Sequence, residues 1–166
     1  MKNNLQTNRG FTLIELLIVI AIIAALAVTV FVALNPLKRL QDARDSRRTS
    51  DVEGILTAIH ESIVDNKGSL PTNMPIAGGS EVQLGNGSSG CAITNAVSGC
   101  AVTATICADL NTGATNLTKY LKSMPIDPTS TFTASKSGYS VQIDTNNIIT
   151  IRACGVEGTT AITQSR

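Results

Sequence analysis

The feature that most constrains this chain is a run of 24 residues, from Phe11 to Leu34, in which Glu15 is the only charged side chain. As a helix with a rise of about 1.5 Å per residue, the run extends for roughly 36 Å, which is enough to cross the hydrocarbon core of a bilayer. Charged residues make up only 15% of the chain, and the apolar residues gather in roughly the first forty positions. The sequence therefore predicts a membrane-spanning helix near the N-terminus.

Three further segments flank this run. Residues 1–10 are short, polar and basic, with Lys2, Arg9 and no acidic residue. Residues 35–66 predict an amphipathic continuation helix, because apolar side chains recur there at steps of three and four residues. These side chains are Val52, Ile55, Leu56, Ile59, Ile63 and Val64. Residues 67–166 predict a small head. The expected fold class is α+β: a long hydrophobic N-terminal helix followed by a small C-terminal antiparallel β-sheet.

Asn35-Pro36 interrupts the helical pattern and has two interpretations. Proline removes one helical hydrogen bond and crowds the preceding turn, so Pro36 predicts a kink within one long helix. Alternatively, the first helix ends at Leu34 and a second begins, with Asn35 as its N-cap and Pro36 in its first turn. The sequence leaves both open.

The head shows strand signals mainly near its C-terminal end. Residues 139–143 and 148–153 are strand-like runs joined by a loop of hairpin length and composition at 144–147. Residues 72–115 are rich in Gly, Ser, Thr, Asn and Ala, which predicts loops with one strand around 102–107. A short helix is expected over 116–122. The simplest architecture is a small antiparallel sheet packed on the apolar stripe of the continuation helix.

All four cysteines, Cys91, Cys100, Cys107 and Cys154, lie in the predicted head. An even number in an exported domain predicts two disulfides, and the spacings do not match the paired short spacings of a zinc site. Three pairings are open, of which Cys91 with Cys100 and Cys107 with Cys154 is taken first. The predicted disulfides place the head in an oxidising compartment outside the cytoplasm.

The residues around the start of the apolar run carry a recognisable motif. The segment Arg9-Gly10-Phe11-Thr12-Leu13-Ile14-Glu15-Leu16 resembles the class III signal sequence of type IV prepilins and type II secretion pseudopilins. It combines a short basic leader, a Gly before a Phe, a Glu at the fifth mature position and a long apolar helix. The resemblance implies cleavage between Gly10 and Phe11 by a prepilin peptidase, with N-methylation of Phe11.

Glu15 needs a role of its own, because a carboxylate within an apolar membrane helix costs on the order of a few kcal/mol. The resemblance implies that Glu15 pairs with the amino terminus of a neighbouring subunit and sets the register of assembly. The alternative is that Glu15 lies near the membrane face and pairs with its own amino group one turn away.

An ordinary secretory signal is the main rival interpretation. Residues 11–24 would be its apolar region, and Ala25-Leu26-Ala27 resembles a small-residue cleavage site. Glu15 would interrupt that apolar region, and the run continues unbroken to Leu34, so this interpretation is disfavoured.

The positive-inside rule conflicts with an external head, because five basic residues follow the span: Lys38, Arg39, Arg44, Arg47 and Arg48. Interleaved acidic residues and the four cysteines favour the exterior nonetheless.

The predicted function is a structural subunit of a type IV pilus, with a pseudopilin of a type II secretion system as the alternative. A membrane-anchored or secreted binding module is the second alternative. The expected partners are further copies in a helical filament, the prepilin peptidase, a membrane assembly platform and, before assembly, the membrane. Nucleic acid is expected to bind only through an assembled pilus. The expected location is the inner membrane as precursor and the cell surface afterwards.

Enzymatic function, a cofactor and a metal site are not expected. His60 is the only histidine and has no catalytic-type partner nearby in the sequence, which indicates a packing or surface role. Met124-Pro125-Ile126-Asp127-Pro128 resembles the Pro-x-Asp-Pro element of major pseudopilins, but Thr129-Ser130-Thr131 follows where that family has Trp-Gly. Asp127 and Asp144 are considered as calcium ligands, although acidic residues are too sparse to predict a site.

Overall fold

A computed structural model describes residues 10–166, and residues 1–9 of the predicted leader, with Lys2 and Arg9, lie outside the described part. The chain forms two compact units, Met1–Leu40 and Gln41–Arg166. The first unit contains the apolar helix, and the second contains all the β-strands of the described residues. Because the second unit begins at Gln41, it also includes most of the continuation helix that precedes the predicted head at 67–166.

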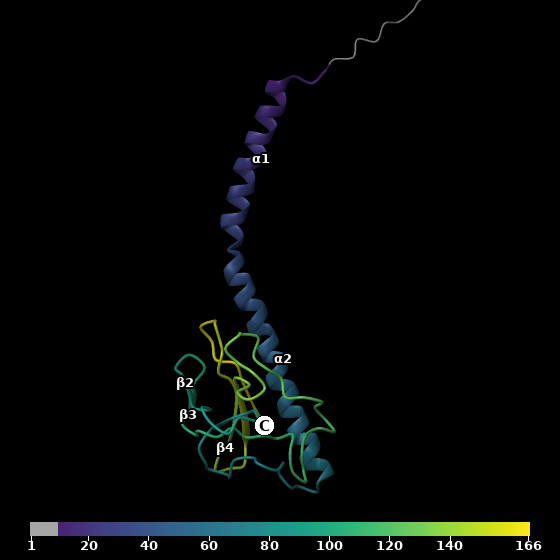
Figure 1. The fold of residues 1–166 in the computed structure, drawn as a ribbon, viewed down its shortest axis with the longest axis vertical. Helices are drawn as coiled ribbons and strands as arrows, with labels where there is room; N and C mark the ends of the chain where they lie inside the picture. The colour runs from purple at the N-terminus through teal and green to yellow at the C-terminus, as the bar shows by residue number, and fades with distance from the viewer. Residues whose placement is uncertain (1–9) are drawn as a thin grey trace, which may run out of the picture. The chain divides into compact units, whose positions relative to one another are not determined.

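Helix α1, Leu13–Leu34, is the apolar helix that the sequence predicts (Figure 1). Its 22 residues extend for about 33 Å. None of its side chains is buried within the chain. Among the described residues, the helical stretch that begins with α1 is long and apolar enough to cross a membrane.

Helix α2, Pro36–Asp65, follows after a single non-helical residue. Asn35 has φ 39° and ψ 75°, a left-handed conformation that ends α1. The Asn35 side-chain oxygen then accepts a bond from the Lys38 backbone N–H at 3.5 Å. Pro36 therefore lies in the first turn of a separate helix, where its missing N–H has no helical partner to lose.

The apolar stripe of α2 forms one side of the core. Val52, Ile55 and Ile59 are completely buried in the cluster that also holds the sheet residues. Burial of each such side chain contributes about 1.5–3 kcal/mol. The sequence also places Val64 on this stripe, but its side chain is 76% exposed, whereas Ile63 beside it packs against the core.

The sheet is antiparallel with the strand order β1-β4-β5-β6. The strands are β1 Val82–Gln83, β4 Tyr139–Ile143, β5 Ile149–Ala153 and β6 Thr163–Ser165. β4 and β5 form the predicted hairpin, with Tyr139 opposite Ala153 and Ile143 opposite Ile149. The α+β fold class and its small antiparallel sheet are thus confirmed.

The loop-rich part between α2 and β4 differs from the sequence prediction. β2 Ile93–Asn95 and β3 Cys100–Val102 form a separate two-stranded ribbon, so of the strand expected around 102–107 only Val102 lies in a strand. Residues 116–122 form turns instead of a helix. Leu117 is fully buried there and accepts bonds from the N–H groups of Tyr120 and Leu121, which makes only a single turn.

A buried ion pair joins α2 to the segment before β4. The Arg48 side chain is 0% exposed, and its Nε and Nη2 donate to the two oxygens of Asp127 at 2.7 and 2.8 Å. Thr129 also donates to Asp127 through its backbone N–H and its hydroxyl. The fork of the guanidinium thereby matches both carboxylate oxygens in a site without water access.

Two glycines leave the space that this carboxylate occupies. A Cβ on Gly155 would lie 2.4 Å from Asp127 Oδ2, and one on Gly138, where φ is +84°, would lie 2.7 Å from the Asp127 Cβ. No side chain fits at either position without moving the ion pair. The residue before β4 and the segment after β5 therefore leave room for Asp127.

The same face of α2 holds the chain segment that follows β5. Glu157 accepts from Arg44 Nε at 2.5 Å and from Arg48 Nη1 at 3.2 Å. Asp45 accepts the backbone N–H groups of Glu157 and Gly158 at 3.3 and 2.8 Å. Part of the basic run that conflicts with the positive-inside rule is therefore used inside the second unit.

These contacts set the charge states of the acidic residues. Burial raises the pKa of Asp127, but the hydrogen bonds from Arg48 and Thr129 outweigh burial and hold the pKa below its usual value. The hydrogen bond from Arg44 lowers the pKa of Glu157. Both carboxylates are thus ionised in the folded head at neutral pH.

We expect Asp127→Asn to lower the free energy of unfolding of the second unit by about 3–5 kcal/mol, because the buried Arg48 guanidinium would lose its one fully buried counter-charge. Urea unfolding of the full chain in detergent micelles, followed by circular dichroism, measures this loss. Arg47→Met is the matched control: the Arg47 side chain is 62% exposed and lies 3.7 Å from Asp51. Arg47→Met should lower the free energy of unfolding by less than about 1 kcal/mol. Equal losses in the two variants would contradict the role given to the buried pair.

Acidification tests the same pair independently. The folded pKa of Asp127 lies below the unfolded value of about 3.9, so its stabilisation is complete above that pH and is lost as the pH falls through the folded pKa. The unfolding free energy of the wild type should therefore fall more steeply below about pH 4 than that of Asp127→Asn.

Candidate functional site

The predicted cleavage site lies immediately before the first helix. Gly10 and Phe11 are exposed and non-helical, and a Cβ added to Gly10 would meet nothing within 4 Å. The Phe11 side chain is 78% exposed. A peptidase needs an accessible bond outside regular secondary structure, and the Gly10–Phe11 bond has both properties in the described chain.

The start of α1 is fixed by a capping box between Thr12 and Glu15. The Thr12 hydroxyl accepts from the Glu15 backbone N–H at 3.3 Å, and Glu15 Oε2 accepts from the Thr12 backbone N–H at 2.8 Å. The Thr12 hydroxyl also donates to the same oxygen at 2.8 Å. Thr12 and Glu15 therefore each satisfy one free backbone N–H at the start of α1 in the uncleaved chain. The sequence reasoning missed this role, although Thr-x-x-Glu before an apolar run is its usual signature.

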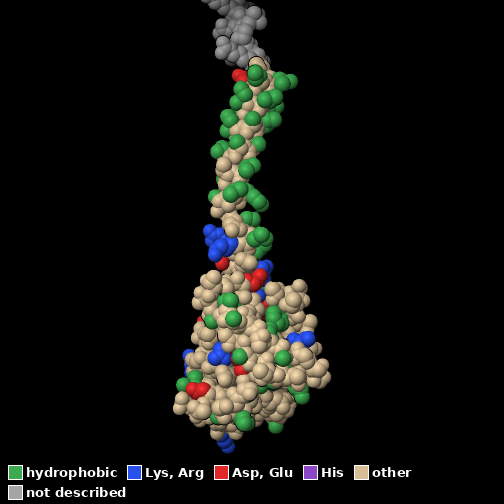
Figure 2. All heavy atoms as spheres, turned by 90° about the vertical axis from the view of Figure 1, so that its left-hand side faces the viewer, with side chains coloured by type: hydrophobic (Ala, Val, Ile, Leu, Met, Phe, Trp, Pro, Cys, Tyr) green, Lys and Arg blue, Asp and Glu red, His purple; other side chains and the backbone are tan. Residues whose placement is uncertain are grey.

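The surface of α1 is apolar on all sides. Figure 2 shows hydrophobic side chains along its visible length. Leu13, Val32 and Phe31 are 82%, 74% and 66% exposed, and the intervening large residues are similarly accessible. Such a helix needs lipid or other apolar helices around it, because exposure of this surface to water is unfavourable.

The four cysteines form two disulfides, but the pairing differs from the one taken first. Cys91 bonds Cys107, and Cys100 bonds Cys154. The pairing of Cys91 with Cys100 and of Cys107 with Cys154 is therefore wrong. The reason is the β2–β3 ribbon, which turns between Cys91 and Cys107 and directs Cys100 toward the end of β5. Sequence spacing could not show that turn.

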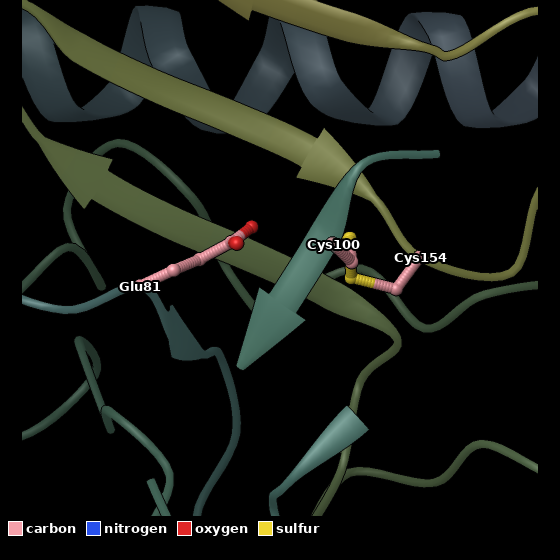
Figure 3. A group of neighbouring side chains, drawn as sticks. All are labelled: Glu81, Cys100 and Cys154. Atoms are coloured by element: carbon pink, nitrogen blue, oxygen red, sulfur yellow. A yellow bond between two sulfur atoms is a disulfide. The ribbon is translucent and has the colours of Figure 1, made fainter. Parts of the chain in front are cut away.

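A buried carboxylate lies beside the second disulfide (Figure 3). Glu81, Cys100 and Cys154 bring one oxygen and two sulfur atoms within 4.8 Å of one another, and all three residues are buried. The two sulfurs are bonded to each other. Any cation there would compete with groups that already satisfy the Glu81 carboxylate.

Glu81 instead joins three strands. Its Oε2 accepts from the backbone N–H of Ala101 in β3 at 2.8 Å, and its Oε1 accepts from the Ser140 hydroxyl in β4 at 2.5 Å. Arg152 Nη1, from β5, lies 3.3 Å from Oε1. Nothing in the local sequence around Glu81 signals this role, because all three partners come from distant segments.

The two aspartates considered for calcium have other partners. Asp127 is enclosed with Arg48, so its oxygens face a guanidinium and not an open site. Asp144 accepts the backbone N–H groups of Asn146 and Ile148 at 2.8 Å each, which fixes the turn between β4 and β5. These hydrogen bonds hold the pKa of Asp144 below its usual value.

His60 lines an open hollow of about 420 Å³ at the end of α2, together with Tyr120, Asp65 and Arg166. Burial lowers the pKa of His60, and its Nε2 has no hydrogen-bond partner among residues 10–166. Asp65 accepts from Lys119 Nζ at 2.6 Å and from the Tyr120 hydroxyl at 2.8 Å. These two bonds to Asp65 hold the turn at 117–120 against α2.

Comparison with known proteins bears on the N-terminal segment. Residues 5–31 match the prokaryotic N-terminal methylation motif, which is the class III signal motif of type IV pilins and pseudopilins. The match includes Gly10, Phe11 and Glu15 and confirms the resemblance. The pilin-type motif is that of a structural family rather than an enzymatic one, and it implies prepilin peptidase processing. No curated protein and no solved structure matches the chain.

We expect the four cysteines to be oxidised in the pairs Cys91–Cys107 and Cys100–Cys154. Alkylation of unreduced, denatured protein should label none of them, and four labelled thiols would show that neither disulfide forms. Mapping needs a non-tryptic digest, since no Lys or Arg lies between Cys91 and Cys107. Replacement of the Cys100–Cys154 pair by Ser should destabilise more than replacement of the other pair, because its separation is 54 residues against 16. Both losses should fall within about 2–5 kcal/mol.

Proposed function

We propose that this chain is the precursor of a type IV pilin. Cleavage after Gly10 would release a subunit that begins at Phe11, with α1 as membrane anchor and later as part of a filament core. Support comes from the methylation motif matched over residues 5–31, which includes most of α1, an exposed helix whose only charged residue is Glu15. This coincidence of the motif with an exposed apolar helix is the observation that carries the proposal.

Transfer of α1 from lipid to a bundle of identical helices is physically reasonable. Lipid tails are as apolar as the side chains of α1, so packing against other copies does not require exposure of the helix to water. The second unit has a hydrophobic core and disulfides of its own and would form the outer surface of the filament. The inner membrane is then the site of the precursor, and the cell surface is the site of the assembled subunit.

Glu15 is the residue that we assign to assembly. Cleavage creates a cationic amine at Phe11, and a carboxylate in apolar surroundings is strongly favoured by an adjacent cation. In the uncleaved chain Glu15 bonds Thr12, and this contact leaves its other oxygen, Oε1, without a hydrogen bond among residues 10–166. That oxygen can accept a hydrogen bond from the amine of a neighbouring copy while the capping box persists.

A pseudopilin of a type II secretion system is the second candidate. It shares the processing site and the apolar helix, and the Pro125-Ile126-Asp127-Pro128 segment resembles the corresponding element of major pseudopilins. Asp127 has a structural role through Arg48 here, so this element gives no support for a calcium loop. Electron microscopy of sheared surface filaments, with a secretion assay in the same strain, separates the two candidates.

Processing between Gly10 and Phe11 is the first test of the proposal. Intact mass spectrometry of the native protein should give a chain that starts at Phe11 and carries one additional methyl group. Gly10→Val should leave the longer precursor in the membrane, because the branched side chain obstructs the bond to be cut. Mature protein of normal mass from that variant would argue against class III processing.

Glu15→Leu should abolish or strongly reduce surface filaments, because it removes the assembly contact. The protein should remain in the membrane, because the substitution also removes the insertion cost of a few kcal/mol. Filaments are counted by electron microscopy of sheared material, and the membrane fraction is immunoblotted in parallel. Thr12→Ala is the matched control, because it weakens the cap by about 1 kcal/mol but keeps the carboxylate. If both variants lose filaments equally, Glu15 acts through helix capping and not through contact with a second copy.

A further inference from the structure

The first turn of α2 carries two exposed cations. Lys38 and Arg39 are both accessible, and neither forms an ion pair within residues 10–166. Arg44 and Arg48, about one and a half and two and a half turns later, are paired with carboxylates of the second unit. We refer to residues 37–40 as the collar. Figure 2 shows basic side chains where the hydrophobic surface of the long helical stretch ends.

The collar is also amphipathic. Leu37 and Leu40 are 73% and 57% exposed. At 3.6 residues per turn these two side chains lie about 60° apart around the helix, while Arg39 lies roughly 100–160° from them. One side of this turn is therefore apolar, and the other is cationic. A single helical turn of this kind suits the boundary between acyl chains and headgroups.

The distance from the span places the cations at headgroup depth. Lys38 and Arg39 follow Leu34 by four and five residues, which corresponds to about 6–8 Å along a helix. The polar layer on each side of the hydrocarbon core is about 5–8 Å thick. Because residues up to Leu40 belong to the same compact unit as α1, this depth does not depend on the placement of the second unit.

We propose that the collar is a binding site for anionic phospholipid headgroups. Arg39 offers a planar fork of donors for phosphate oxygens, and Lys38 offers a compact ammonium charge on a flexible stem. Leu37 and Leu40 contact the upper acyl chains on the other side of the turn. The site requires that α1 spans a membrane, but it does not require that the subunit assembles into a filament.

Lipid is favoured over the other occupant of matching charge, a carboxylate of a second copy. The collar adjoins a helix that is apolar all round, so the membrane that holds α1 also supplies headgroups beside Lys38 and Arg39. Two neighbouring cations and two neighbouring leucines match the two layers of a lipid molecule better than a single acidic side chain. An acidic partner would leave the collar indifferent to the charge of the lipid.

A tryptophan reporter at the collar tests the proposal. The chain has no Trp, so Leu37→Trp gives a single site-specific signal and keeps an apolar side chain at the interface. The full chain is reconstituted in vesicles of phosphatidylcholine and phosphatidylglycerol, with one lipid at a time brominated near the headgroup end of its acyl chains. Stronger quenching by brominated phosphatidylglycerol measures its local enrichment. We expect roughly fivefold enrichment at low salt and little in molar salt, where charges are screened.

Charge variants in the reporter background complete the test. Lys38→Gln with Arg39→Gln should reduce the enrichment to near one, while the head variant Lys122→Gln with Lys136→Gln, which removes the same charge, should retain it. A wild-type collar with no preference between the lipids, or a preference that persists in molar salt, would overturn the proposal. So would an unchanged preference in the collar variant. Filament loss alone would leave these readouts unaffected, so failure of the pilin proposal is distinguishable.

Discussion

Because the Arg48 guanidinium is fully buried against Asp127, the second unit closes only when α2 and the segment before β4 meet in a single arrangement. Two charges out of water are unfavourable unless the geometry satisfies both, and the paired bonds at 2.7 and 2.8 Å do so. Gly138 and Gly155 leave room for the carboxylate, and Glu157 adds a second acidic contact to the same arginine. We infer that the pair specifies the packing as much as it stabilises it.

The first unit follows a different principle. Its helix has no buried side chain in the isolated chain, so its surroundings must come from outside: lipid before assembly and other copies afterwards in the proposed filament. The capping box gives Glu15 a local partner, which reduces the number of unsatisfied polar groups at the apolar end of α1. Glu15, which we assign to assembly, thus has a hydrogen-bond partner while the subunit is still in the membrane.

Covalent and polar cross-links support the part of the second unit that has little regular structure. Between α2 and β4 the strands are only two or three residues long, and the chain is rich in glycine and small polar residues. The Cys91–Cys107 bond closes one loop, and Cys100–Cys154 attaches the β2–β3 ribbon to the end of β5. Glu81 reinforces the same junction by binding β3, β4 and β5. Disulfides stabilise this part of the chain by reducing the conformational entropy of its unfolded state. The few contacts of such short strands would offset that entropy poorly on their own.

The sequence by itself determined the features that depend on local pattern. The apolar span, the processing motif, the start of α2 or a kink at Pro36, and the β4–β5 hairpin all follow from periodicity, turn residues or spacing within a few positions. The tertiary structure decided the disulfide pairing, the burial of Arg48 with Asp127 and the strand-joining role of Glu81. Cys100 and Cys154 are 54 positions apart, and Arg48 and Asp127 are 79 positions apart. No local pattern encodes such contacts, because they exist only once the core has brought distant segments together.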